Sequence, residues 1–227
     1  MINITIVTPV WQRPLLTAIY LRHLTRLVQS ARGYGFNLGA VIVGSERGAS
    51  YGLVQKLTSF NYVEHPNKPL GAKFNKGVEK ALERGADYVL IMGSDQFVRP
   101  SIFKEYAAAI EAGHEYVGVH DTYIWDPDGG VAIYWPGYTD YREGRVIGPG
   151  RLISRKVLES LEGGLYNDEG GIRALDHSAD EVLPEPLVIT GRPHLFTSIK
   201  TANSLNHINT ASGAEKVMVE NFYEFLV

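Results

Sequence analysis

Four polar clusters follow apolar runs of strand length, and these clusters are where chemistry is expected. The runs end at Thr8-Pro9, at Gly44-Ser45-Glu46, at His65-Pro66-Asn67 and at Ser94-Asp95-Gln96. Ligands of an open parallel sheet bind beyond the carboxyl ends of its strands, so these side chains should share one site. Neither a P-loop nor the dinucleotide glycine motif follows the first run, which argues against ATP hydrolysis and NAD chemistry.

Asp95 has the surroundings of a metal ligand. It follows the apolar run Tyr88–Met92 almost directly, and a carboxylate at a strand end can hold Mg²⁺ or Mn²⁺ through its oxygens. The chain has no cysteine, so any bound metal must use oxygen or imidazole ligands. The alternative is a plain turn residue, because aspartate also favours turns.

The elements that must position these residues alternate between strands and helices. Apolar, β-branched runs predict strands at 4–10, 39–44, 61–64 and 88–92, while helical spacing predicts helices from Pro14 to Gly33 and over 74–82. This alternation predicts an α/β fold with a mostly parallel, Rossmann-like central sheet and helices on both faces.

The second half of the chain gives a looser pattern. We expect a helix over 102–112, a strand over 116–120 and an aromatic loop over 121–145. A helix capped by Ser154 should follow, and the tail 214–226 has helical spacing. No linker of disordered composition interrupts the chain, which predicts a single domain over 1–227.

Composition narrows the function classes. The net charge is −3 and charged residues make up 21% of the chain, which gives no support to general nucleic-acid binding or to membrane-surface binding. No apolar run approaches the length of a membrane span, and the N-terminus lacks the basic region of a signal peptide. We therefore expect a cytoplasmic protein.

The order of the motifs carries a family resemblance. The segment Asn67–Gly77 (NKPLGAKFNKG), a helix, the strand at 88–92 and then Ser94-Asp95 and Pro100 resemble the nucleotide-sugar half of GT-A glycosyltransferases, closest to the family-2-like group. The resemblance covers 3–103 and continues more loosely through 148–155 and 176–181. It implies a nucleotide-sugar-binding half at about 1–103 and an acceptor-binding half at about 104–227.

The resemblance also implies a donor site and a metal. The residues that would contact the donor are Thr8, Pro9, Val10, Arg13, Glu46, Asn67, Gly71, Lys73, Asn75, Ser94 and Asp95. Asp95 would bind Mn²⁺ or Mg²⁺, with His194 or His207 as a further ligand. The sequence departs from the family pattern at Gly93, where the first acid of the metal motif usually stands, and at Gln96.

The acceptor half should supply a general base, because inverting transfer requires a carboxylate that takes the proton of the attacking hydroxyl. Asp176 is the first choice and Asp180 the alternative, with Glu181 close by; acids at a helix start can also be purely structural. Aromatic residues of the preceding loop would either face a sugar ring or pack as a satellite core: Tyr123, Trp125, Trp135 and Tyr138.

The resulting hypothesis is a metal-assisted, inverting glycosyltransferase that uses a nucleotide-diphosphate sugar, in the first instance UDP-linked. Its acceptor would be a soluble glycan, a protein, a small molecule or modified DNA. One alternative is a nucleotidyltransferase of similar architecture, although the Gly-rich basic signature of that class is missing after the first strand. The other is a non-catalytic sugar- or nucleotide-binding module, for which Gly93 is the best support.

Overall fold

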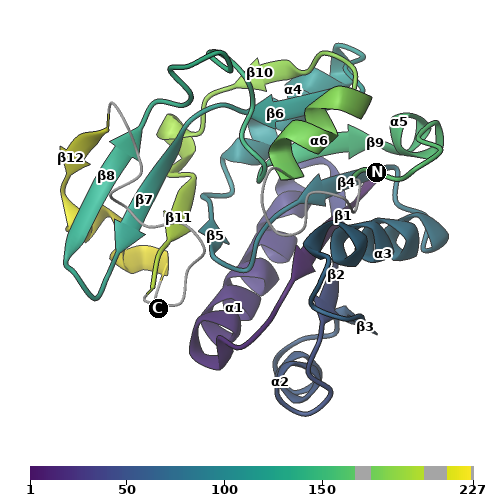
Figure 1. Ribbon diagram of the computed structural model, residues 1–227, viewed down its shortest axis with the longest axis horizontal. Coiled ribbons are helices and arrows are strands. Elements are labelled where there is room, and N and C mark those ends of the chain that lie inside the picture. The colour runs from purple at the N-terminus through teal and green to yellow at the C-terminus, as the bar shows by residue number, and fades with distance from the viewer. Residues whose placement is uncertain (167–174, 202–213, 226–227) are drawn as a thin grey trace.

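The computed structural model describes residues 1–166, 175–201 and 214–225 (Figure 1). The first hundred residues follow the predicted alternation. Their elements are β1 (Ile2–Pro9), α1 (Pro14–Ala31), a 3-10 helix η1 (Arg32–Tyr34), β2 (Phe36–Gly44), α2 (Ala49–Leu57), β3 (Asn61–Glu64), α3 (Leu70–Glu83) and β4 (Tyr88–Ile91). Helix α1 begins with Pro14 in its first turn, where a missing N–H costs nothing.

The second half contributes shorter elements. They are β5 (Gln96–Phe97), α4 (Ile102–Glu111), β6 (Tyr116–Val119), β7 (Thr122–Asp126), β8 (Val131–Trp135), β9 (Arg151–Ser154), α5 (Arg155–Glu159), α6 (Leu175–Val182), β10 (Leu187–Ile189), η2 (Arg192–His194), β11 (Thr197–Ile199), β12 (Glu215–Val217) and η4 (Val219–Phe225). The predicted cap of α5 is confirmed, since Ser154 Oγ accepts the Val157 N–H at 3.2 Å.

The large sheet has seven strands in the order β10-β6-β9-β4-β1-β2-β3. Strands β1, β2, β3 and β4 are parallel, and so are β6 and β10, but β9 runs antiparallel to both β4 and β6. The prediction of a mostly parallel sheet is therefore wrong in this respect: the sheet is mixed. The direction of β9 is set by long-range pairing, because its partners β4 and β6 lie far from it along the chain.

The second sheet has five strands in the order β12-β8-β7-β11-β5 and is also mixed. It corrects two expectations. The segment predicted as a loop over 121–145 contains the β7–β8 hairpin, and the tail predicted as a helix contains strand β12 before the 3-10 turns of η4. The two errors have different causes. The five-residue strands of the hairpin are hidden in a segment rich in aromatic residues, glycine and aspartate, and the three-residue edge strand β12 pairs with β8 far along the chain, which leaves little periodicity of its own.

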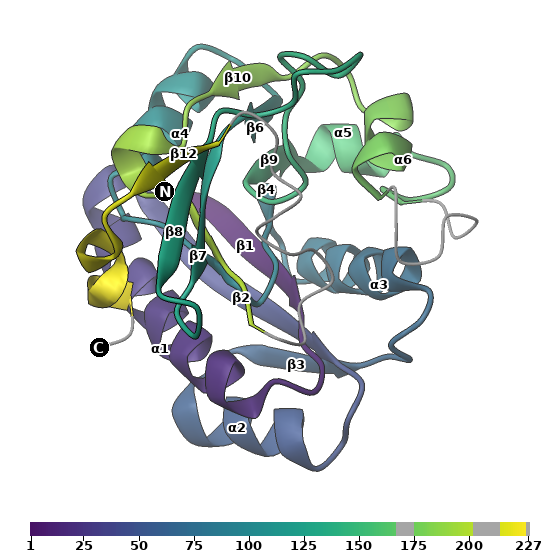
Figure 2. The same ribbon diagram turned by 60° about the vertical axis from the view of Figure 1, so that its left-hand side comes forward.

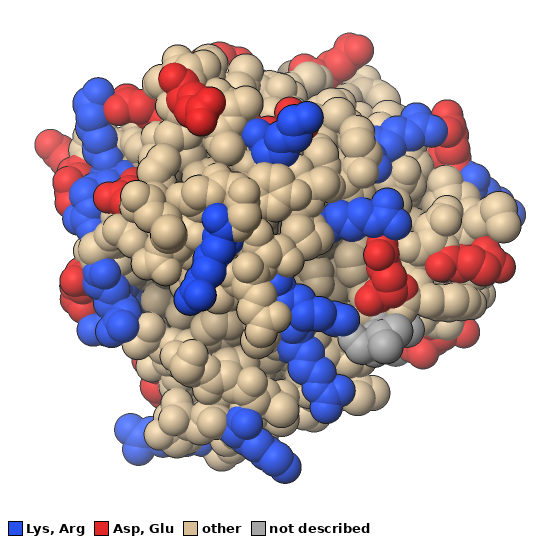
Figure 3. Space-filling model, turned by 180° about the vertical axis from the view of Figure 1, so that it is seen from behind, with Lys and Arg blue, Asp and Glu red and all other residues tan. Residues whose placement is uncertain are grey.

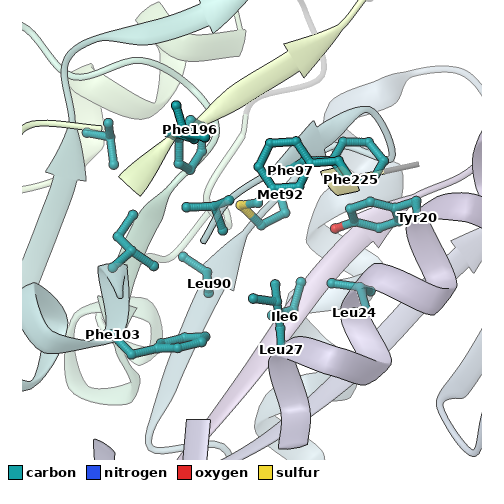
Figure 4. Close-up of a cluster of buried hydrophobic side chains, with 14 of the residues drawn as sticks. Ile6, Tyr20, Leu24, Leu27, Leu90, Met92, Phe97, Phe103, Phe196 and Phe225 are labelled. Carbon is teal, nitrogen blue, oxygen red and sulfur yellow. The ribbon is translucent and has the colours of Figure 1, made fainter. Parts of the chain in front are cut away.

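Helices cover both faces of the large sheet, as predicted. Figure 2 shows α1 and α4 on one side and α3, α5 and α6 on the other. Neighbouring strand residues alternate between the two cores, so Ile6 and Leu90 pack under α1 while Val7 and Val89 pack under α3. In Figure 4, Phe97 and Phe225 extend the first core toward the small sheet. The same strands therefore supply residues to the cores on both faces of the sheet.

The surface fits the modest net charge. On the face opposite Figure 1, basic and acidic side chains are interspersed with uncharged ones (Figure 3). Among the described residues, no helix combines the length and apolar character needed to cross a membrane.

Candidate functional site

The site lies where the chain passes from the large sheet to the small one. Strand β4 ends at Ile91, and Asp95 immediately precedes β5 of the small sheet. Arg13, just before α1, donates from Nη1 to Asp95 Oδ2 at 3.2 Å and from Nη2 to Ser94 Oγ at 3.0 Å. The Arg13 guanidinium therefore connects the segment after β1 to Ser94 and Asp95, which follow β4. The carboxyl ends of the two strands lie together, as the alternation predicts.

A second cation completes this cluster. Lys200 directly follows β11, and its Nζ lies 3.9 Å from Asp95 Oδ2. The last residue of β11, Ile199, donates its N–H to the Asp95 carbonyl at 2.8 Å. Burial alone would raise the pKa of the Asp95 carboxyl, but Lys200 and Arg13 together lower that pKa below its usual value. Asp95 is consequently ionised at neutral pH, and its charge is balanced by two side chains.

A strained turn directs Arg13 into the cluster. Gln12 has φ of 49°, a left-handed conformation that costs a non-glycine residue free energy. Its N–H donates to Glu46 Oε2 at 3.3 Å, and Ser50 Oγ contacts the same oxygen at 3.5 Å. Glu46 thus joins the segment after β1 to the loop after β2, and its contact with a donor stays a prediction.

Lys73 ties two further loops together. Its side chain is fully buried, and Nζ donates to the Val10 carbonyl at 2.8 Å and to Asn67 Oδ1 at 3.1 Å. The contacts make Lys73 a brace between the loops after β1 and β3, and its contact with a donor stays a prediction. Burial lowers the pKa of Lys73 to about 8.

This lowered pKa gives a testable pH dependence. The unfolded chain, with an ordinary pKa of 10.5, binds the Lys73 proton more tightly than the folded chain does, so stability should rise with pH between 8 and 10.5. Between pH 7.5 and 9.5, urea unfolding should show the parent gaining about 2 kcal/mol relative to Lys73→Met. The exposed Lys156→Met is the control and should follow the parent. Equal pH slopes for the parent and Lys73→Met would contradict the assignment.

Other predicted donor residues have structural partners. Thr8 Oγ1 lies 2.9 Å from Tyr20 Oη inside the core, and the Val10 N–H donates to the Val43 carbonyl at 2.9 Å. Asn75 clamps the Tyr166 backbone, donating to its carbonyl at 2.7 Å and accepting its N–H at 3.0 Å. Each of these residues thus has a partner within the protein, and their contacts with a donor stay predictions.

Two more predicted donor residues lie near the ends of secondary-structure elements. Gly71 is buried in the first turn of α3, and Pro9 is the half-buried last residue of β1. Their contacts with a donor stay predictions.

Asp176 approaches the same end of the sheet from the other half. Ile91 at the end of β4 pairs with Arg151 at the start of β9, so the segment Gly148–Gly150 lies beside the residues that lead to Asp95. The Asp176 carboxylate rests against Gly148, where any Cβ would collide with Oδ1. Its Oδ2 accepts a hydrogen bond from Tyr138 Oη at 3.1 Å.

Asp180, the alternative base, has a different environment. Its Oδ1 lies 2.8 Å from Nη2 of Arg151, whose side chain is fully buried beneath α6. Arg151 also donates to the carbonyls of Ile147 at 3.0 Å and Asp176 at 3.3 Å. The Asp180 carboxylate thereby holds α6 on the sheet. The Asp176 carboxylate instead lies against Gly148, just before the start of β9.

The aromatic residues divide between core and site. Trp125 stacks on Phe222 and Tyr123 packs on the same ring, so both belong to the core of the small sheet. Trp135 and Tyr138 form an edge-to-face pair at 5.0 Å, half-buried beside Asp176. Burial raises the pKa of the Tyr138 hydroxyl, and so does the nearby Asp176 carboxylate. Tyr138 therefore stays protonated and can orient Asp176.

The described residues do not form a three-ligand cage for a divalent ion. Asp95 is paired with two cations, and no group of three His, Asp or Glu side chains suited to a metal occurs in the described part of the chain. Gln96 Oε1 is enclosed against Gly93 without a hydrogen-bond partner, and that contact fills the place where the resemblance puts the first acid.

His194 does not complete it. Strand β11 runs antiparallel to β5, so Ile199 lies beside Asp95, whereas His194 lies at the opposite end, where its carbonyl accepts the Arg99 N–H. The His194 ring contacts Ser101 Oγ at 2.9 Å and Glu105 at 3.7 Å. His207 lies outside the described residues.

Sequence reasoning missed two charged residues of this region. Lys200 follows the three-residue strand Thr197–Ile199, which is too short to show the alternation of a strand. The sequence offers only a charged residue after an isoleucine as a signal. Arg151 lies inside the segment noted for its resemblance, but nothing local predicts a fully buried guanidinium.

Comparison with solved structures identifies the fold. TarS of S. aureus, residues 1–349, matches with a TM-score of 0.61 at 11% identity, over 87% of this chain and 60% of that chain. The same segment in complex with UDP-GlcNAc matches with a TM-score of 0.58 at 14% identity, over 99% and 64%. This chain thus spans less than two thirds of the TarS segment.

A second kind of enzyme also matches. 4-Diphosphocytidyl-2C-methyl-D-erythritol synthase gives a TM-score of 0.55 at 14% identity, over 84% of this chain and 88% of that chain. Neither a protein-family model nor a curated protein matches the chain. At these identities the likeness concerns the fold alone. The chain has a GT-A-like α/β fold, shared with TarS and with the synthase.

Proposed function

We propose that the chain is a glycosyltransferase that moves a sugar from a nucleotide-diphosphate sugar to an acceptor hydroxyl, with inversion at the anomeric carbon. One observation carries the proposal. A cationic cluster around Asp95 and the carboxylate of Asp176 lie at the same end of the paired strands β4 and β9. Positive charge suits a leaving diphosphate, and a carboxylate suits the removal of a proton.

The proposed reaction uses these two groups from opposite sides. The acceptor oxygen attacks the anomeric carbon and passes its proton to Asp176, whose second oxygen is held by Tyr138. The bond between the anomeric carbon and the diphosphate oxygen breaks, and its electron pair stays on that oxygen. Trp135, paired with Tyr138, offers an apolar ring beside the acceptor position.

A uridine-linked donor is the first to test. The TarS structure that matches this chain was solved in complex with UDP-GlcNAc, and that complex motivates the choice. The loops held by Glu46 and Lys73 border the place where a nucleoside would lie. A divalent ion at Asp95, as the family resemblance implies, is the less favoured partner of the diphosphate, because two cations already contact that carboxylate.

A nucleotidyltransferase is the second candidate, favoured by the match that covers 88% of the synthase. The two reactions release different products: a glycosyltransferase frees a nucleoside diphosphate from a nucleotide sugar, and a nucleotidyltransferase frees pyrophosphate from a nucleoside triphosphate. We expect slow release of UDP from a UDP-sugar, with water as the acceptor. Pyrophosphate release from UTP or CTP with a sugar phosphate would support the second candidate instead, and neither product would indicate a binding module.

A further inference from the structure

The cluster around Asp95 has the composition of a diphosphate-binding site that needs no metal. Arg13 and Lys200 bring two positive charges to one carboxylate, so the cluster keeps a net positive charge of one. A guanidinium has five N–H donors, and the structure assigns two of the Arg13 donors to Asp95 and Ser94. The side chains of Arg13, Asp95 and Lys200 are all less than a quarter exposed, which strengthens their electrostatic interactions.

The same features disfavour a divalent ion. Such an ion would have to approach Asp95 against two cations within 4 Å of its carboxylate. The neighbouring acceptor, Gln96 Oε1, is sealed against Gly93 and offers no open ligand position. Mg²⁺ sites use one or two carboxylates that are free to bind, together with substrate phosphates.

We propose that Arg13 and Lys200 neutralise the leaving diphosphate in place of a divalent ion, with Asp95 as the positioning residue that holds both cations. This inference rests on the proposed function and deepens it. Arginine is suited to the role because its planar fork matches two phosphate oxygens at once. Lys200 adds a point charge from the small sheet, so diphosphate binding would draw on both sheets.

The decisive experiment measures binding by the parent chain and needs no variant. Isothermal titration with UDP, GDP, CDP and ADP is run in EDTA and repeated with Mn²⁺, and uridine monophosphate serves as a reference. One diphosphate should bind in EDTA with an affinity within about threefold of that in Mn²⁺, well inside the tenfold that 1.4 kcal/mol represents. Titration of Mn²⁺ alone, followed by electron paramagnetic resonance, should show no specific site.

Variants then assign the cations. Arg13→Met and Lys200→Met should each weaken diphosphate binding in EDTA about tenfold or more, since a hydrogen bond to a charged group contributes about 1.5 kcal/mol or more, and should change monophosphate binding less. Arg99→Met and Lys156→Met are matched controls, because both side chains form ion pairs on the surface. Asp95→Asn removes the carboxylate that both cations contact, so it should weaken diphosphate binding in EDTA without abolishing it.

Two results would overturn the inference, and they are distinguishable. Diphosphate binding that requires Mn²⁺ and disappears in Asp95→Asn would establish a metal site and leave the glycosyltransferase proposal standing. Failure to bind any of the diphosphates, with or without Mn²⁺, would remove the proposed function and the inference with it.

Discussion

Replacing Asp176 by asparagine should lower the rate of donor turnover by about 10²–10⁴-fold, the range expected when a general base is lost. The amide keeps the shape of the carboxylate, and its oxygen can still accept the Tyr138 hydrogen bond. It cannot accept the proton of the attacking hydroxyl. UDP release from a UDP-sugar measures the loss with water as the attacking group, so the assay needs no sugar acceptor.

Binding and stability separate this role from a structural one. Asp176→Asn should bind UDP as the parent does, because the cations proposed to meet the diphosphate are Arg13 and Lys200. Its melting temperature should also match the parent. Glu181→Gln is the control, since Glu181 is exposed on the same helix and pairs only with His177 in the described structure. Undiminished turnover by Asp176→Asn would sink the assignment.

The second large effect is on stability. Asp180→Ala should lower the free energy of unfolding by about 3–5 kcal/mol, because it leaves the charge of Arg151 buried beneath α6 without its carboxylate. Urea unfolding at neutral pH measures the difference. Glu79→Ala is the matched control: it breaks the exposed pair with Lys76, a contact of 2.7 Å, and should cost no more than about 1 kcal/mol.

A double variant tests the cause of that loss. Arg151→Met with Asp180→Ala removes both charges, so it should be more stable than Asp180→Ala alone. If Asp180→Ala instead unfolds like the parent while donor turnover falls, Asp180 is the functional carboxylate and Asp176 the structural one.

The sequence predicts the large sheet well because its strands and helices are local signals. The apolar run at 88–92 and the spacing along α1 each predict an element without reference to distant residues, and the structure places β4, β1 and β2 side by side. Strand direction in β9 and the pairing of β12 with β8 depend on contacts far apart in the chain. Periodicity carries no information about them.

The site divides in the same way. Asp95 and Asp176 are recognisable because each acid follows apolar residues at the boundary of an element. The contacts of the surrounding side chains cannot be predicted from the local sequence. Lysine is a residue type that often binds phosphate, but Lys73 is buried and connects two loops. Lys200 and Asp95 are more than a hundred residues apart in the sequence, and the pairing of β11 with β5 brings them together.

The packing of Gln96 against Gly93 has an evolutionary consequence. A side chain at position 93 would collide with Gln96 Oε1, and Gln96 is buried and bonded to Ser198 Oγ at 3.3 Å. A carboxylate at 93 would therefore force the end of the Gln96 side chain away from position 93 and disturb its hydrogen bond with Ser198. Drift from this chain toward a two-acid metal motif would have to include this rearrangement of Gln96, so positions 93 and 96 are expected to change together.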